Sequence, residues 1–238
     1  MEGKENTGDV AYFEQWNIYR KVIKYNYMFH AEIIDIVRQE IYDLKDISVL
    51  DLGCGDSHVL VSSIDKALNF QYLGIDTAKD AIRFSEKNLS SCKGDARHIN
   101  GDFFVELEKL TGGFDVVISG YSLHHLNREK KEKFFSLVSN LLSDLGVFIF
   151  YDIESNIGES QVEYKTRTYR ILRKNWKQIN GNEMDIIINH INNYDMPENE
   201  DFHMENMSKN GFINIKKPFK DKYDLYSLYV SRKHSRLR

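Results

Sequence analysis

Cysteines and long apolar runs are scarce in this chain of 238 residues. Its two cysteines, Cys54 and Cys92, provide neither a disulfide framework nor the paired spacing of a zinc-binding loop. No stretch approaches the ~18 apolar residues of a membrane-spanning helix. The polar residues 1–9 do not resemble a secretory signal. We therefore expect a reduced, cytoplasmic protein without membrane contacts.

The chain also lacks a strong excess of charge of either sign. Its formal net charge is −4, with 29% charged and 42% hydrophobic residues. Such a balance gives no general attraction to nucleic acids or acidic membranes, so a nucleic-acid partner is not expected. The hydrophobic content is ample for a core, and the length fits one large domain with a small addition. The composition leaves the oligomeric state open.

Apolar spacing along the first two thirds of the chain predicts helices and strands in alternation. Residues 10–44 show helical spacing with a break near 24–30, which indicates two helices. The expected strands are 48–52, 71–75, 98–100, 114–119 and 147–152, and the expected helices between them are 58–68, 78–90, 103–110 and 127–143. This alternation predicts an α/β fold with a parallel sheet and helices on both faces.

The pattern changes after residue 152. Residues 159–192 indicate a helix or a helix pair interrupted near Asn180 and Gly181, and this segment is rich in aromatic and basic side chains. A further helix is expected at 199–209, followed by strands at 213–217 and 225–230. We interpret the aromatic and basic residues, and His190, as packing and ion pairs of a lid more than as substrate contacts.

The most informative segment is the strand and turn at residues 49–57, Val-Leu-Asp-Leu-Gly-Cys-Gly-Asp-Ser. Gly53 and Gly55 let backbone N–H groups approach a ligand that a Cβ would keep away. A dinucleotide-binding turn needs a third glycine where His58 stands, and no Gly-Lys-Ser/Thr of a phosphate loop follows. Asp51 at the strand end suits a cationic ligand better than a phosphate, although it could also cap the turn.

Two more acids stand at the ends of the next predicted strands. Asp76 is placed where a carboxylate can accept hydrogen bonds from both ribose hydroxyls, and Asp102 where it can accept one from an exocyclic amine. Each has a simpler alternative: Asp76 could compensate a helix dipole, and Asp102 could cap the helix that begins at Phe103. With Asp51, the three acids suit an amino group, a ribose and an adenine without a phosphate. That combination describes S-adenosylmethionine.

These segments resemble the class I S-adenosylmethionine-dependent methyltransferases over residues 45–152. The family's motifs match residues 49–55, Asp76, Gly101-Asp102-Phe103, and Phe114–Ser119 followed by Leu123-His124-His125-Leu126. Ser57 stands where the family often has glycine. The resemblance implies a Rossmann-like, mostly parallel seven-stranded sheet with helices on both faces, its last strand antiparallel and inserted beside the sixth.

The resemblance also implies which residues bind the cofactor. Asp51 and Gly53 would line the methionine end, Asp76 the ribose, Asp102 with the Phe103 backbone the adenine, and Ser119-Gly120 the amine. The predicted cofactor-binding residues are Asp51, Gly53, Cys54, Gly55, Asp76, Thr77, Asp102, Phe103, Ser119 and Gly120, with Tyr19, Met28 and His30 closing over them. Thr77 could also be the N-cap of the helix at 78–90.

Methyl transfer is an in-line displacement that depends mainly on alignment. An oxygen or nitrogen acceptor can still lose a proton, and His124, His125 and Glu154 are the predicted catalytic residues that could accept it. The histidine pair can equally be structural. Because the sequence shows no further ligand cluster beside the pair, we expect no metal.

The predicted organisation is an N-terminal helical cap (1–44), a cofactor-binding core (45–154), a helical lid (155–198), and a C-terminal helix with the last two strands (199–238). The predicted function is methyl transfer from S-adenosyl-L-methionine to an oxygen or nitrogen of a small-molecule metabolite, with S-adenosyl-L-homocysteine as product. The alternatives are a protein or RNA methyltransferase, or an inactive cofactor-binding sensor or partner subunit. The Asn/Asp-Pro-Pro-Tyr/Phe motif of amino-directed enzymes is absent from residues 119–122, and no subfamily is assigned.

Overall fold

The computed structural model describes residues 7–233, with side chains from residue 16 onward. The ends of the predicted first and last segments, residues 1–6 and 234–238, lie outside the described residues. The helices are α1 (Thr7–Lys24), α2 (His30–Ile41), α3 (His58–Ser63), α4 (Lys79–Leu89), α5 (Phe103–Leu107), α6 (Arg128–Leu141), α7 (Gln161–Asn175), α8 (Gly181–Tyr194) and α9 (Glu200–Lys209), with a 3-10 turn η1 (Leu123–His125). The strands are β1 (Ile47–Leu52), β2 (Phe70–Asp76), β3 (Gly94–Asn100), β4 (Phe114–Gly120), β5 (Leu142–Ser155), β6 (Glu198–Asn199), β7 (Ile213–Lys220) and β8 (Tyr226–Arg232).

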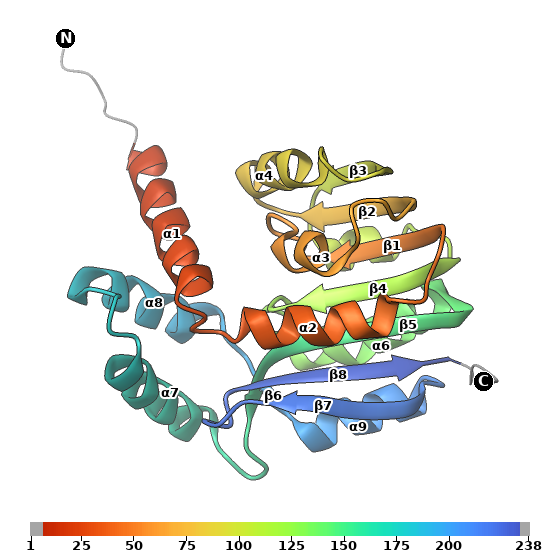
Figure 1. Ribbon diagram of the computed structural model, residues 1–238. Helices are drawn as coiled ribbons and strands as arrows, with labels where there is room; N and C mark the ends of the chain where they lie inside the picture. The colour runs from red at the N-terminus through yellow and green to blue at the C-terminus, as the bar shows by residue number, and fades with distance from the viewer. Residues whose placement is uncertain (1–6, 234–238) are drawn as a thin grey trace.

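The strands form one mostly parallel sheet in the order β3-β2-β1-β4-β5-β8-β7 (Figure 1). Strands β1 to β5 pair in parallel, whereas β8 is antiparallel to both β5 and β7, and the short β6 pairs with β5. The insertion of an antiparallel last strand beside its predecessor confirms the predicted fold class. The strand order reverses at β1, because β2 and β3 lie on one side of it and β4 and β5 on the other. Ligands of open α/β sheets bind beyond the carboxyl ends of the strands at this point.

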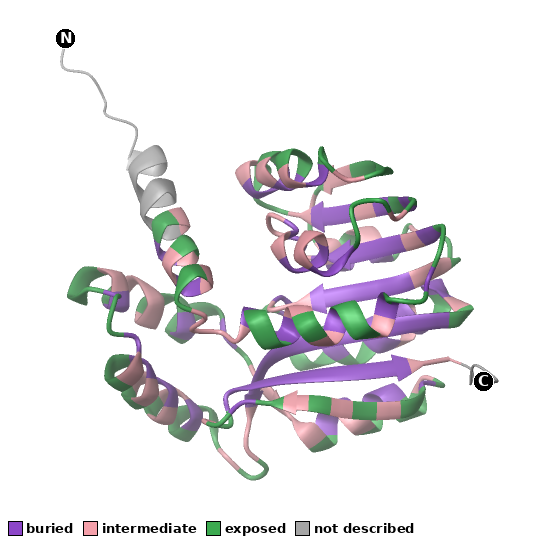
Figure 2. Ribbon diagram, viewed as in Figure 1, coloured by how far each residue is buried: buried purple, intermediate pink, exposed green. Residues whose placement is uncertain are grey.

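The central strands are continuous apolar runs in the sequence because both of their faces are buried. In β1, β4 and β5 the central residues are buried in unbroken runs, because helices cover both faces (Figure 2). One face packs on α2, α3 and α4, and the other on α5, α6 and α9. The edge strand β7 instead alternates exposed and half-buried residues and carries lysines and a proline, which discourage pairing with another strand.

The helices α1, α7 and α8 form a cap around a third apolar cluster. The cap lies beyond the carboxyl ends of β2 and β4 (Figure 1). Serine and asparagine capping boxes start α7 and α8, respectively. Helix α1 joins them through an ion pair between Lys21 and Glu183 at 2.7 Å. In the turn after α1, Tyr27 stacks on Trp176 with ring centroids 5.0 Å apart. The aromatic residues of this insertion thus pack the cap.

The N-terminal helices do not form one unit, in contrast to the predicted cap of residues 1–44. Ile33, Val37 and Ile41 of α2 are buried in the core against the sheet, so α2 belongs to the core. Of these two helices, only α1 packs with α7 and α8. The helical cap of the fold is therefore assembled from segments far apart in the sequence.

Candidate functional site

The turn after β1 has the backbone shape that its glycines indicate. Gly53 has a φ of +69°, and a Cβ there would lie 2.5 Å from the Cβ of Ser122. The Gly53 and Cys54 N–H groups donate to the Ile75 carbonyl at 2.9 and 3.0 Å. Gly55 has a φ of +53° and faces open space. Any side chain on these two glycines would strain the turn or narrow the space beside it.

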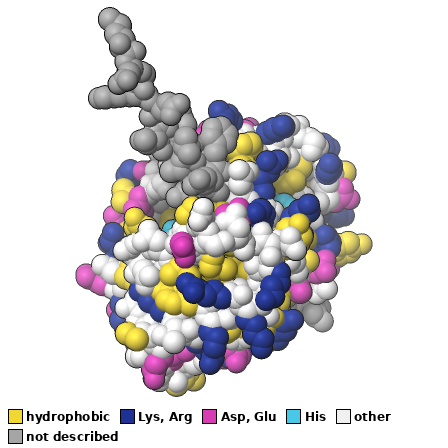
Figure 3. Space-filling model, turned by 90° about the vertical axis from the view of Figure 1, so that its left-hand side faces the viewer, with side chains coloured by type: hydrophobic (Ala, Val, Ile, Leu, Met, Phe, Trp, Pro, Cys, Tyr) yellow, Lys and Arg dark blue, Asp and Glu magenta, His cyan; other side chains and the backbone are white. Residues whose placement is uncertain are grey.

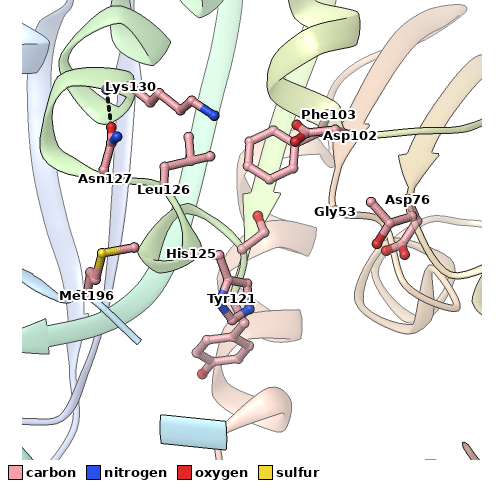
Figure 4. A pocket seen from close by; sticks show the side chains of 12 residues that line it. Gly53, Asp76, Asp102, Phe103, Tyr121, His125, Leu126, Asn127, Lys130 and Met196 are labelled. Atoms are coloured by element: carbon pink, nitrogen blue, oxygen red, sulfur yellow. Dashed lines mark hydrogen bonds between the residues drawn. The ribbon is translucent and has the colours of Figure 1, made fainter. Parts of the chain in front are cut away.

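Two cavities open beyond the strand ends on either side of this turn. The larger, about 540 Å³, is lined by Gly53, Asp76, Thr77, Asp102, Phe103, Tyr121, Ser122, His125, Leu126, Asn127, Lys130 and Met196. The smaller, about 290 Å³, is lined by residues of the glycine turn and by Tyr19, Met28, His30, Asp51, Gly120 and Tyr151 among others. Gly53, Asp76 and Tyr121 line both. Figure 4 shows the larger cavity with Asp76 and Asp102 on one side and His125 and Met196 on the other.

The acids after β2 and β3 line the larger cavity while they organise local backbone. Asp76 accepts hydrogen bonds from the N–H groups of Gly55 at 2.9 Å and Ala78 at 2.8 Å. Ala78, not Thr77, is the N-cap of α4, so the alternative capping role of Thr77 is wrong. Asp102 caps α5 through one carboxylate oxygen, Oδ1, which accepts from Phe104 and Val105. Its other oxygen makes no such capping bond.

Asp51 is buried at the end of β1 and lines the smaller cavity. Burial, and to a smaller extent the nearby Asp76 and Asp56, raises the pKa of its carboxyl to about 7, although a hydrogen bond from Tyr72 opposes the shift. Such a group is ready to ionise beside a cation.

A continuous row of hydrogen bonds leads away from Asp51. Tyr72 donates to Asp51 at 3.2 Å, and its hydroxyl is 2.6 Å from the Ser57 hydroxyl. Ser57 is 2.5 Å from the Ser85 hydroxyl, which is 2.6 Å from Nε2 of His98. Ser57 has a φ of +57°, a left-handed conformation that favours glycine over residues with a Cβ. Its hydroxyl therefore has a buried role that glycine could not fill.

Helix α1 and the segment after it cover the smaller cavity. The Tyr19 hydroxyl donates to Asp56 at 2.7 Å, and Trp16 stacks on Phe84 of α4 with ring centroids 4.5 Å apart. The Tyr121 hydroxyl donates to the Met28 carbonyl at 2.5 Å. Tyr19, Met28 and His30 all line this cavity, where the sequence predicted a cover.

The structure thus brings twelve of the thirteen predicted cofactor-binding residues to the walls of the two cavities. The exception is Ser119, which lies fully buried with its hydroxyl 3.1 Å from that of Ser122. Neighbouring Gly120 does line the smaller cavity. Burial lowers the pKa of His30 to about 3, so this side chain is a neutral part of the wall.

The three predicted catalytic residues separate in the structure. His125 lines the larger cavity, and burial together with the neighbouring His124 lowers its pKa to about 4. His124 is buried, and its Nδ1 and backbone N–H both contact Asp152. Burial alone would lower the pKa of His124, but the charge of Asp152 and its hydrogen bond raise it.

Glu154 lies away from both cavities, which argues against its predicted catalytic role. Its carboxylate accepts hydrogen bonds from Lys217 at 2.6 Å, from Ser227 at 3.0 Å and from Tyr229. It is 4% exposed. These partners on β7 and β8 make it part of a buried polar cluster instead of a proton acceptor for a substrate.

Several residues at the site were not predicted. Tyr121, Lys130 and Met196 line the larger cavity, and Figure 4 shows Lys130 and Phe103 directed toward the same space. His190 and Asp195 of the cap lie beside the histidine pair. The expectation that no further ligand-type side chains lie near the pair is therefore wrong. The sequence carried no signal for these neighbours, because they are more than sixty residues from the pair.

Comparison with known proteins identifies the family. A methyltransferase-domain family model matches residues 43–201, more than half of the chain. The chain belongs to the methyltransferase domain family. An uncharacterized protein of Rickettsia prowazekii is 26% identical over 110 residues, which span 46% of this chain and 44% of that protein. A carboxy-S-adenosyl-L-methionine synthase of Campylobacter lari is 22% identical over 199 residues, 81% of each chain.

Solved structures support the same fold. The magnesium protoporphyrin IX methyltransferase of Synechocystis, determined with S-adenosylhomocysteine bound, aligns with a TM-score of 0.59 at 15% identity, over 98% of this chain and 90% of that one. In family and fold this chain is a class I S-adenosylmethionine-dependent methyltransferase. No helix within residues 7–233 is long and apolar enough to span a membrane.

The two cavities suit an adenosyl cofactor. The carboxyl groups of Asp51, Asp76 and Asp102 line them, and among the described residues lining the cavities Lys130 is the one basic side chain of the Lys or Arg type. A pyrophosphate would need more N–H or cationic donors than this wall offers. The open space at Gly55 provides room beside the glycine turn.

Proposed function

We propose that this chain transfers the methyl group of S-adenosylmethionine to an oxygen or nitrogen of a small metabolite bound in the larger cavity. The observation that carries the proposal is the composition of that cavity. Asp76, Asp102 and Phe103 line one side, and His125 and Met196 line the other. The nucleoside of the cofactor and the acceptor would therefore share one cavity, as a transfer reaction between two bound molecules requires.

The proposed cofactor position spans both cavities through the residues that they share. Asp76 would accept from the ribose hydroxyls, Asp102 from the adenine amine, and Asp51 would face the ammonium group. Bound S-adenosylmethionine supplies a methyl group that is already strongly electrophilic. The protein then has to align the acceptor atom with this methyl group and to exclude water.

Tyr121 is the residue best placed to orient the acceptor against the cofactor. It lines both cavities, and its hydroxyl is held by the Met28 carbonyl. Its backbone φ of +49° is unusual for a residue of this size. His125 at the acceptor end presents an imidazole that is neutral at physiological pH, because its pKa is low.

Enclosure favours a small acceptor over a macromolecule. The cap supplies Tyr19 and Val22 from α1 as wall residues of the smaller cavity, and Met196 follows α8 in the wall of the larger. On the cap face, basic and acidic side chains are interspersed with hydrophobic ones (Figure 3). With a net charge of −4, the chain has little general attraction for RNA.

Mass spectrometry of both the donor and the acceptor tests this proposal. The chain is incubated with S-adenosylmethionine and a panel of hydroxyl- and amine-bearing metabolites, with RNA and total protein as separate acceptors. We expect S-adenosylhomocysteine together with a singly methylated metabolite. Asp76→Asn, which preserves side-chain size, is the matched control and should lower the yield at limiting donor concentration.

Each other outcome excludes the proposal in a different way. Methylation confined to RNA or protein would replace the small acceptor by a macromolecule. Tight binding of S-adenosylmethionine without turnover on any acceptor would indicate a sensor. Conversion of the donor to a carboxylated derivative would indicate the activity named for the Campylobacter relative.

A further inference from the structure

We propose that His124, His125, His190 and Asp195 bind a divalent transition-metal ion where the cap meets the core. One ligand-type atom from each residue lies within 4.8 Å of the others. His124 and His125 belong to η1 after β4, His190 to the last turn of α8, and Asp195 directly follows that helix. The cluster thus joins the core to the cap.

The distances within the cluster suit shared coordination better than direct hydrogen bonds. Oδ1 of Asp195 lies 3.6 Å from Nε2 of His124 and 3.5 Å from Nε2 of His190. These separations are long for hydrogen bonds. Two ligand atoms that are each ~2.1 Å from a tetrahedral ion lie about 3.4 Å apart. A small rotation of the exposed His125 or His190 side chain would bring the widest pair to the same range.

Asp195 supplies an independent sign that a ligand is needed. Its side chain is 8% exposed, and within residues 16–233 its Oδ1 has no hydrogen-bond partner. A buried carboxylate oxygen without a donor costs free energy. That oxygen is the atom nearest to two of the imidazoles, so a cation at this point would satisfy it.

His124 is held in the orientation that a metal ligand requires. Asp152 contacts its Nδ1 through one oxygen and accepts its backbone N–H at 2.9 Å through the other. A proton on Nδ1 leaves the lone pair of Nε2 directed toward Asp195. Histidines that bind metals commonly donate their other ring N–H to a carboxylate, which fixes the tautomer.

The other members are positioned by backbone contacts between η1 and the turn after α8. The Met196 N–H donates to the His124 carbonyl at 2.9 Å. Nδ1 of His125 lies 3.4 Å from the Tyr194 carbonyl, which leaves its Nε2 free. The nearby cation Lys131 is held by the Met196 carbonyl and lies 3.6 Å from Glu198.

Three imidazoles and one carboxylate form a donor set that suits Zn²⁺ and similar ions of intermediate softness. Because His125 also lines the larger cavity, the ion would adjoin the acceptor end. His125 then acts as a ligand instead of a proton acceptor. Four protein ligands complete a tetrahedron and leave no open position, so the ion would be structural and would fix the cap to the core beside the acceptor end. Metal binding itself does not rest on the proposed function, since it is measured without substrate.

Titration of the metal-free chain with Co²⁺ and Zn²⁺ tests the site. We expect one equivalent of Co²⁺ to bind with visible absorption of low-coordinate cobalt, and Zn²⁺ to displace it. Zn²⁺ should also raise the melting temperature of the chain, because it binds the folded state. His190→Ala and Asp195→Asn should each weaken binding by at least tenfold and abolish that increase. Asp185→Asn, an exposed acid on the same helix, is the matched control and should bind as the unaltered chain does.

Failure of the chain to bind either ion above the level of a chelator-treated blank would overturn the site. Equal binding by the unaltered chain, His190→Ala and Asp195→Asn would also overturn it, since the ion would then lie elsewhere. Melting in chelator confirms that each variant is folded. The His190 side chain is 49% exposed, so its variant separates loss of the ligand from loss of the fold.

Discussion

Replacing Asp51 with asparagine should remove a pH dependence of stability that this one carboxyl creates. Its pKa is about 7 in the folded chain, against ~3.9 for an unfolded chain. Between these values the folded state holds a proton that the unfolded state has lost, so stability falls as pH rises. At ~1.4 kcal/mol per pKa unit, the loss reaches about 4 kcal/mol by pH 8. Asp51→Asn should therefore be the more stable protein at pH 8, and the difference should vanish toward pH 4.

The same carboxyl should couple cofactor binding to proton release. If Asp51 faces the ammonium group, binding favours the ionised form and expels a proton below pH 7. Affinity for S-adenosylhomocysteine should then fall about tenfold per pH unit below 7. Calorimetry in two buffers with different ionisation heats counts the proton directly. Asp51→Asn should release none.

Adenosine is the matched ligand for this experiment, because it lacks the ammonium group. Its affinity should be nearly independent of pH. An equal pH dependence for adenosine and S-adenosylhomocysteine would refute the placement of Asp51 at the amine. An unchanged slope in Asp51→Asn would assign the proton to another group. His30 is not such a group above pH 5, because its pKa of about 3 keeps it neutral there.

Three further substitutions test the other interpretations. Asp76→Asn replaces one of the two acceptor oxygens, which accept from the Gly55 and Ala78 N–H groups, by an NH2 donor and removes the charge that would face the ribose hydroxyls. Affinity for S-adenosylhomocysteine should therefore fall ten- to hundredfold in calorimetry, or by about 1.5–3 kcal/mol. Glu154→Gln leaves the Lys217 ammonium with Glu200, 2.8 Å away, as its remaining carboxylate partner among the described residues. The free energy of unfolding should fall by about 2 kcal/mol in denaturant titration, with ligand affinity little changed; a selective loss of turnover would instead support a catalytic role. Ser57→Gly relieves a left-handed backbone worth ~1 kcal/mol but removes two buried hydrogen bonds worth ~1 kcal/mol each, so thermal unfolding should show a small net destabilisation. A more stable Ser57→Gly protein would contradict this account.

The core of the site could be predicted from sequence because its signals are local. Gly53, Asp76 and Asp102 each lie at or just after a short strand, and parallel strands bring their ends together. The spacing within each motif therefore specifies the site before the packing is known. The acids do more than the sequence indicated, since Asp102 is a helix cap as well as a cavity residue.

What could not be predicted depends on packing between distant segments. Helices α1 and α2 have similar apolar spacing, yet one joins α7 and α8 and the other the sheet. Glu154 lies near the end of β5, on the side of the sheet where the cavities open, but its partner Lys217 is 63 residues away and comes from an edge strand. Spacing along the chain carries no information on either pairing. The neighbours of His124 and His125 were missed for the same reason.

The row of hydrogen bonds from Asp51 to His98 has a direction, and the charge of Asp51 sets it. When Asp51 is ionised, Tyr72 must donate to it, so each serine hydroxyl must donate to the group before it in the row. Ser85 then has no proton left for His98, and Nε2 of His98 must carry one. When Asp51 is protonated, each hydroxyl in the row can donate its hydrogen bond in either direction. A ligand ammonium bound beside Asp51 would thus select one tautomer of His98, a half-exposed residue on β3. The nitrogen chemical shifts of His98 would then report the ionisation of Asp51, although Asp51 itself is buried.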